Sequence, residues 1–352
     1  MSLDDDVKKV CYANRSLSGN HSLSPEQKKT LNEVNVAYYT TLADRVAVLA
    51  LKPETVAYIH NLLSLSLSEL GRLDESVFHS KIAHTLVPND PDFNFNLGTF
   101  FVRLGLFDEA LPYLEKAVGL APNVPNNLAE LGLALFKSAN FTTDHVYYPR
   151  AIKFYKMAIE LDPDIYEFHA DLAYYLTELD RFDEAVVHYE KALELKPKKP
   201  WIHNNLGYTL NLRGHEGDYV KALKHLNRAI KLDPSSPNYY AHRADSRRKL
   251  AEKETERGES GKLVAATLQD IIRVYDIVTT KGDMATNGDY NAVVRATYNA
   301  RRIFGTRGED ATSPLDDQDA RQAVLQHLLV QQGIKAGKLT EEYVLQDFKA
   351  PV

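Results

Sequence analysis

The sequence predicts an all-α solenoid, a stack of paired helices. A set of residues recurs every 34 positions: Leu97 and Gly98 return as Leu131 and Gly132. Large apolar residues in each period alternate at spacings of three and four with small ones, as in closely packed helices. A proline, such as Pro88 or Pro122, closes each period where a helix stops. One helix-turn-helix unit of this length cannot bury its apolar face alone, so neighbouring units must stack.

The N-terminal region precedes the clear repeats. Residues 1–24 are polar and are expected to form a flexible tail. Residues 25–51 form one amphipathic stretch that ends in Leu51-Lys52-Pro53, and we interpret residues 25–56 as a degenerate capping helical unit. A repeat array needs such a cap to shield its open end from water.

The predicted array spans residues 57–281. Two units carry extra residues. Gly132 and Ala151 are 19 positions apart, against 12 for Gly98 and Ala110, so seven residues are added in the third unit; three are added in the fifth, near residues 214–218. Both insertions are expected in turns, because the packed helices must keep their register. The six units are 57–90, 91–124, 125–165, 166–199, 200–236 and 237–281.

The C-terminal part departs from the repeat. In the sixth unit a charged extension of the first helix replaces the turn, and the second helix is predicted near residues 263–279. Residues 282–352 carry no repeat signature and are interpreted as a helical cap or a partner-binding module, with helices near 286–304, 315–332 and 340–348. They could cap the array, fold back into its groove or form a separate module.

The pattern of Leu-Gly in the first helix, two alanine contacts in the second and a closing proline resembles the tetratricopeptide repeat (TPR) family. The second unit, with Ala110, Ala117 and Pro122, is nearly consensus. The resemblance is good over residues 57–234 and implies a right-handed superhelix whose first helices line a concave groove that binds a protein segment. Outward positions of these first helices are therefore candidate groove residues: Asp92, Phe95, Asn96, Thr99, Glu130, Leu133, Phe136, Asp171, Tyr174, Trp201, Asn204, Asn205, Tyr208, Asn211 and His242.

The chemistry of these positions suits a polypeptide, since amides bond a backbone and aromatic rings give rigid apolar contact. Asn96 and Asn205 occupy the sixth position, which resembles the asparagine ladder of the O-GlcNAc transferase repeats; Glu130 and Asp171 interrupt it. The chain departs from the carboxylate clamp of chaperone-binding members, because no unit has a Lys at the fifth position followed by an Asn at the ninth, and the predicted groove carries acidic side chains instead. We expect a neutral or basic partner with apolar anchors.

Composition excludes several function classes. The 352 residues carry 42 basic and 48 acidic side chains, and a net charge of -6 argues against nucleic acid. Neither a secretory signal nor a membrane-spanning stretch is recognised, which favours a cytoplasmic protein. The single Cys11 and the scattered histidines suggest no metal site, no cofactor and no catalytic constellation.

The leading hypothesis is a non-catalytic scaffold or adaptor that holds a protein segment in the groove. A chaperone-like escort is the alternative, and a regulatory part of an enzyme complex is a third. We predict that replacing Trp201, Asn205 and Tyr208 together abolishes ligand capture with helix content intact. An exposed end helix could also pair with a second copy to form a homo-oligomer.

Overall fold

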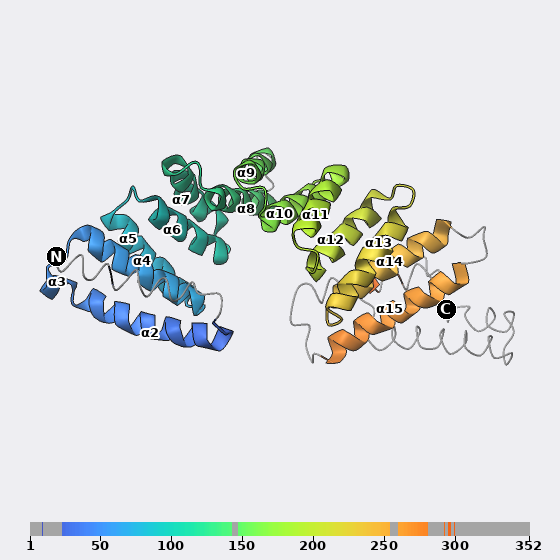
Figure 1. The fold of residues 1–352 in the computed structure, drawn as a ribbon, viewed down its shortest axis with the longest axis horizontal. Coiled ribbons are helices and arrows are strands. Elements are labelled where there is room, and N and C mark those ends of the chain that lie inside the picture. The colour runs from blue at the N-terminus through green and yellow to red at the C-terminus, as the bar shows by residue number, and fades with distance from the viewer. Residues whose placement is uncertain are drawn as a thin grey trace. The chain divides into compact units, whose positions relative to one another are not determined.

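The computed structural model describes residues 23–142, 147–253 and 260–280 and the single positions Lys9, Ala292, Arg295, Ala296 and Asn299. The chain divides into two compact units, Met1–Phe168 (unit 1) and His169–Val352 (unit 2). The elements in the described residues are helices joined by short turns (Figure 1). The predicted all-α fold of paired helices is thereby confirmed.

In unit 1, α2 covers the first repeat pair and is followed by two further pairs. The side of α2 that carries Tyr39 packs against α4 and forms an apolar cluster with Ile59 and Leu63. Ser24 caps α2, because its hydroxyl accepts from the Gln27 N–H while the Gln27 side chain accepts from the Ser24 N–H. The bounds are α2 (Pro25–Asp44), α3 (Val46–Leu49), α4 (Pro53–Glu69), α5 (Leu73–Leu86), α6 (Pro91–Arg103), α7 (Phe107–Leu120), α8 (Pro125–Thr142) and α9 (Tyr147–Leu161).

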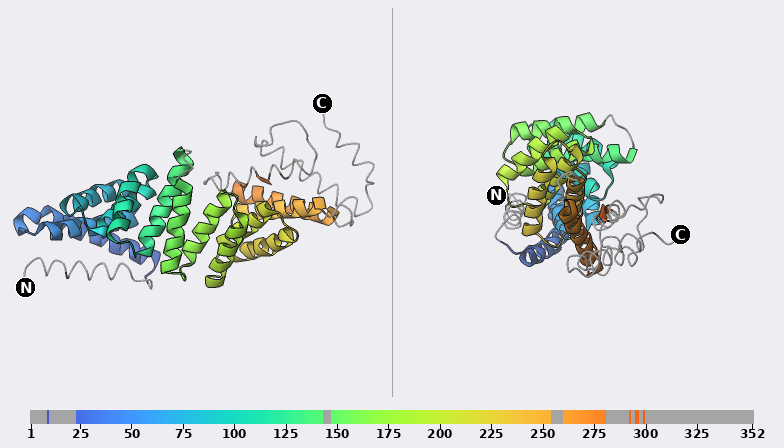
Figure 2. Two further views of the ribbon diagram at one scale, coloured as in Figure 1. Left: turned by 90° about the horizontal axis from the view of Figure 1, so that it is seen from above. Right: turned by 90° about the vertical axis from the view of Figure 1, so that its right-hand side faces the viewer.

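Unit 2 repeats the same pairing, and Figure 2 shows its helices from two further directions. Between α14 and α15, Asp270 accepts hydrogen bonds from Arg243 and Arg247 at 2.6 Å each. This carboxylate is buried, so the two guanidinium groups supply the charge compensation it needs. The bounds are α10 (Tyr166–Glu178), which begins in unit 1, then α11 (Phe182–Leu195), α12 (Pro200–Arg213), α13 (Asp218–Leu232), α14 (Pro237–Lys253) and α15 (Ser260–Thr280).

Small residues allow the helices of each pair to approach closely. A Cβ atom added at Gly98 of α6 would lie 2.6 Å from Cγ of Leu114 in α7, and one at Gly207 of α12 would lie 2.7 Å from Cγ of Leu226 in α13. The repeating alanines of the second helices, such as Ala110, are fully buried. The 34-residue pattern therefore records contact points between helices.

The two insertions differ in structure. The three extra residues of the fifth unit do not all lie in a turn: one lengthens α12, one lengthens the turn at residues 214–217, in which Gly214 and Gly217 adopt positive φ, and one lengthens the start of α13. Arg213 closes that turn through two hydrogen bonds to the buried carboxylate of Asp218. Although burial opposes ionisation, the bonds from Arg213 and from the His215 N–H lower the pKa of Asp218.

The seven extra residues of the third unit correct our expectation of a longer turn. Helix α8 continues to Thr142, whereas α6 ends at Arg103, which corresponds to residue 137 in the third unit. The segment from Lys137 to Thr142 contains neither glycine nor proline, so nothing in it stops the helix. Most of the insertion therefore lengthens the first helix of that pair.

Candidate functional site

In unit 1, the first helices of the repeat pairs bring several predicted side chains together. Spacings of three and four place Asp92, Phe95, Asn96 and Thr99 on one side of α6, next to α4. Asn96 Nδ2 donates to Oδ1 of Asn61 in α4 at 2.8 Å. Phe95 and Asn96 are half-buried and Asp92 is exposed. We call this surface the first-helix face of unit 1.

The sequence pattern did not identify Asn61 as part of this face. Asn61 is buried and fixes the orientation of the Asn96 amide. The buried Thr99 hydroxyl has no hydrogen-bond partner among the described residues. Nearby, Arg103 of α6 donates to the hydroxyl and carbonyl oxygens of Ser68 in α4.

The candidate residues of α8 differ among themselves. Glu130 and Leu133 are half-buried on this helix. Phe136 departs from the expected outward position, because it is fully buried and its ring lies 5.2 Å from that of Tyr148 in α9. The first turn of α9 covers Phe136, so this residue belongs to the core of the pair.

In unit 2, three predicted groove residues connect α12 with α14. His242 Nδ1 donates to Oδ1 of Asn204 at 2.8 Å, and the Asn211 amide donates to the His242 carbonyl and accepts from Ser246. All of them are buried. Burial strongly lowers the pKa of His242, and the positive charge of Arg295 lowers it further. This network joins neighbouring repeats and leaves little of these amides for a ligand.

The other candidates of unit 2 lie on a partly open surface. Tyr174, at 37% exposure, is the most accessible of the aromatic ones, while Trp201 and Tyr208 are half-buried. The Tyr208 ring stacks on His242 with centroids 4.7 Å apart. Asn205 accepts from the Asn204 amide at 3.1 Å and hydrogen-bonds the buried Tyr189 phenol, and Asp171 of α10 is half-buried. We call this surface the first-helix face of unit 2.

The sequence reasoning also missed a histidine pair that recurs in three repeat units. The fourth residue of the unit contacts a histidine of the second helix through the Nδ1 atoms, at distances of 3.0 to 3.1 Å. A signal was present, because two pairs are 19 residues apart and the third, in the unit with three extra residues, is 22 apart. The pairs are His60 with His79, His169 with His188, and His203 with His225.

The hydrogen bonds define which ring nitrogens carry protons in the histidine pair of the fifth unit. His203 Nε2 donates to the Pro197 carbonyl at 3.0 Å, so in a neutral ring its Nδ1 must accept the proton of His225 Nδ1. Burial lowers the pKa of His225 to about 4, and His203 adds to the shift. Burial and His79 likewise lower the pKa of His60 to about 4. Both pairs are therefore neutral near pH 7.

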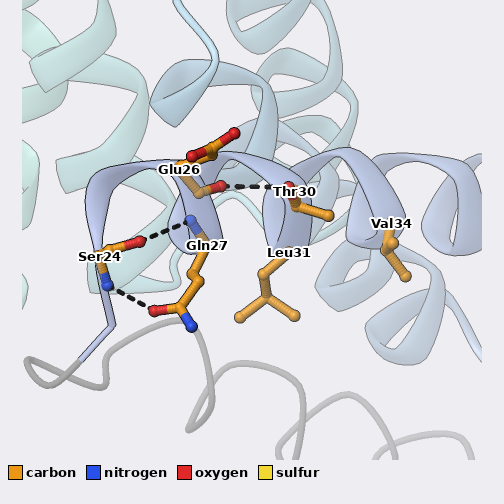
Figure 3. Close-up of a pocket in the computed structure, with 6 residues that line it drawn as sticks. All are labelled: Ser24, Glu26, Gln27, Thr30, Leu31 and Val34. Atoms are coloured by element: carbon orange, nitrogen blue, oxygen red, sulfur yellow. Dashed lines mark hydrogen bonds between the residues drawn. The ribbon is translucent and has the colours of Figure 1, made fainter.

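A hollow of about 710 Å³ lies over α2, and Figure 3 shows the residues that line it. The described residues that line it come from this helix and its cap, and Ser24, Gln27 and Thr30 use their polar side-chain atoms in hydrogen bonds among these residues. Leu31 and the exposed Val34 supply the apolar part. These described residues present no set of polar groups that converge on one point. Among the described residues, no three His, Cys, Asp or Glu side chains are placed to hold a metal ion.

Comparison with known families decides the classification. A TPR repeat model matches residues 173–214, and a Tetratricopeptide repeat model matches residues 91–124. The chain belongs to the tetratricopeptide repeat superfamily. A search of the curated proteins gave no match.

Solved structures of other TPR proteins are similar to this TPR chain. A crystal structure of MamA has 22% identity and a TM-score of 0.43, and the alignment covers 52% of this chain and 94% of MamA. A thermophilic TPR protein of Thermus thermophilus has 22% identity and a TM-score of 0.44, and the alignment covers 54% of this chain and 98% of that protein. YrrB, described as a TPR protein with an unusual peptide-binding site, has 21% identity and a TM-score of 0.43, and the alignment covers 52% of this chain and 89% of YrrB. At these identities the likeness concerns the fold alone.

Membership of the TPR superfamily indicates the general role of the chain. TPR arrays are protein interaction scaffolds that bind protein or peptide partners, and members are generally non-catalytic. In the part of the chain that the structure describes, every helix is too short or too polar to cross a bilayer.

Proposed function

We propose that this TPR protein is a non-catalytic scaffold that holds peptide segments on the first-helix faces of its units, and that the face of unit 1 binds a peptide through backbone contacts. One observation carries the proposal: the Asn96 amide, oriented by the buried Asn61, lies on the same side of α6 as the half-buried Phe95. An amide that is already oriented loses little side-chain entropy when a ligand binds.

The chemistry of this face supports an extended or helical peptide. The bond to Asn61 uses one N–H of Asn96, so its carbonyl oxygen and second N–H can pair with a peptide backbone. Phe95 offers a rigid apolar surface of the kind that forms binding hot spots. The exposed Asp92 favours neutral or basic ligands over acidic ones.

Unit 2 contributes differently. Its amides Asn204 and Asn211 bond within the unit, so contacts there would come mainly from the partly exposed rings of Tyr174 and Trp201. The loss of capture after replacing Trp201, Asn205 and Tyr208 together stays a prediction. The Asn205 contact with Tyr189 requires that the folding of this variant be checked by circular dichroism.

The test uses a peptide library in three charge classes, each with and without aromatic residues, and the full-length chain. Basic and neutral peptides with apolar residues are expected to bind, and acidic ones are not. The double variant Phe95→Ala/Asn96→Ala should weaken the best peptide by about tenfold or more, the usual effect of truncating central contacts.

A matched control is Phe78→Ala/Asn89→Ala. Phe78 is 61% exposed on α5 and Asn89 is exposed in the turn before α6, so the same residue types are removed outside the first-helix face. This variant should bind like the parent. Equal affinity of both double variants, or a preference for acidic peptides, would refute the proposal.

A further inference from the structure

Four positions C-terminal to the array lie against unit 2. Ala292, Arg295, Ala296 and Asn299 are helical, and their spacings of three, four and seven place them on one side of a helix. They fall within the helix predicted over residues 286–304. Ala292, Ala296 and Asn299 are fully buried.

The two alanines belong to the core of unit 2. They join one apolar cluster with Tyr240 and Ala244 of α14 and with Leu268 of α15. Small side chains at these two positions allow the helix backbone to approach α14 closely. A large or charged side chain at either position would remove this contact.

The two polar residues contact the first-helix face of unit 2. The Arg295 guanidinium carbon lies 4.8 Å from the centroid of the Tyr208 ring, a cation-π distance. Asn299 Oδ1 accepts from Nε of the buried Arg248 at 2.7 Å. Tyr208 and His242, which the repeat pattern assigns to a peptide groove, thus lie beside the chain's own Arg295.

We propose that the first-helix face of unit 2 is a binding surface for an arginine-bearing helix, and that the chain's own segment around Arg295 occupies it in cis. The inference rests on the proposed scaffold function and specifies the ligand chemistry of one face. In the bound helix, the arginine contacts the Tyr208 ring. The residues three positions before and one position after this arginine are small and pack against α14. The residue four positions after it carries an amide oxygen that accepts from Arg248.

This occupancy makes unit 2 a regulated surface. An external partner of the same chemistry must compete with a ligand tethered in the same chain, whose effective concentration is high. Partners that lack the arginine are directed to the face of unit 1. Release of the segment around Arg295 would open the second surface.

The test measures binding in trans by fluorescence anisotropy. The probe is a labelled synthetic peptide of residues 286–304, and the receptor is the full chain carrying Ala296→Glu, which puts a carboxylate into the apolar contact and releases the resident segment. The variant should bind the peptide at least about tenfold more tightly than the parent chain, since the competitor is removed. The peptide with Arg295→Ala should bind several-fold more weakly.

Two control variants identify the surface. Ala37→Glu makes the same substitution at an exposed alanine of α2 and should bind the peptide like the parent. Tyr208→Ala added to Ala296→Glu should lose the gained affinity. If circular dichroism shows that Ala296→Glu does not fold, Arg295→Glu serves as the second released variant, because it removes the cation-π contact without enlarging the buried alanine.

The proposal fails if neither released variant binds the peptide more tightly than the parent, or if Tyr208→Ala leaves the gained affinity unchanged. A parent chain that sediments as a dimer and becomes monomeric with Ala296→Glu would also overturn it, because the segment would then come from a second copy. Each of these failures leaves the test of Phe95 and Asn96 unaffected, so the scaffold function is judged separately.

Discussion

Gly98 shows how a single position controls the distance between two helices. The Leu114 side chain of α7 lies against the α6 backbone at Gly98, closer than any Cβ atom permits. The same arrangement joins Gly207 to Leu226 in the fifth unit. Glycine recurs at this place because the second helix uses the space, despite the lower helix propensity of glycine.

We predict that Gly98→Ala destabilises the chain by about 1 to 3 kcal/mol, because the added methyl group overpacks against Leu114. Gly119→Ala is the matched control. It lies in α7 with no atom within 4 Å of an added Cβ, and alanine should stabilise the helix there by roughly 0.5 to 1 kcal/mol. Urea unfolding compares the two; equal midpoints would contradict the close contact.

At the scale of secondary-structure elements, histidine pairs and one buried carboxylate join first helices to second helices. The pair of His60 and His79 joins α4 to α5, and Asp270 joins α15 to α14. Each contact requires a defined charge state: the histidine pair is neutral, and the carboxylate faces two guanidinium groups. Both should therefore respond to changes in charge.

We predict that stability falls as the pH decreases from about 7 to about 5. The pKa of His60 and of His225 is about 4 in the folded chain and 6.5 in the unfolded chain. Between these values the unfolded chain binds protons that the folded chain does not, so stability present above pH 6.5 is lost toward pH 4. Partial exposure limits the loss to roughly 1 to 2 kcal/mol per pair.

The measurement is the urea midpoint at several pH values. His60→Asn/His79→Asn keeps polar side chains that do not titrate and should show a smaller decrease than the parent. His215→Asn changes an exposed histidine and should retain the full decrease. If the double variant has the parent's pH dependence, the pair does not contribute to it.

We predict that Asp270→Asn destabilises unit 2 by about 3 kcal/mol, because two partly buried guanidinium groups lose their buried counter-charge. Asp183→Asn is the control. Asp183 also contacts an arginine, Arg213, but its side chain is 76% exposed, and such pairs contribute about 0 to 1 kcal/mol. Thermal unfolding followed by circular dichroism checks both; similar melting temperatures would contradict the role of Asp270.

At the scale of the whole molecule, a repeat protein is stabilised mainly by contacts between neighbouring pairs. Local damage should therefore stay local. We predict that Gly98→Ala increases amide hydrogen exchange most in α6 and α7 and that Asp270→Asn does so in α14 and α15. Exchange measured by mass spectrometry tests this, and a uniform increase across both units would indicate a single cooperative fold.

Much of this fold could be predicted from the sequence, because the repeat period records contacts between residues a few turns apart. The continuation of α8 to Thr142 was missed, since an insertion without glycine or proline can extend a helix as readily as it can form a turn.

The candidate site was harder to predict. A first-helix position faces outward only if no neighbouring helix covers it, and neighbours bury Phe136, Asn204, Asn211 and His242. Their burial depends on side chains far away in sequence, such as Tyr148 for Phe136. Asn96 with Asn61, and Tyr208 with Arg295, likewise depend on partners that the 34-residue period does not specify.

Trp201 is the single tryptophan of the chain, and it is half-buried on α12, two turns before Tyr208. Its indole emission therefore comes from one known place beside the surface that Arg295 occupies. Entry or departure of a helix there would change the polarity around the indole and shift the emission wavelength. Tryptophan fluorescence of the native chain thus reports whether the first-helix face of unit 2 is occupied.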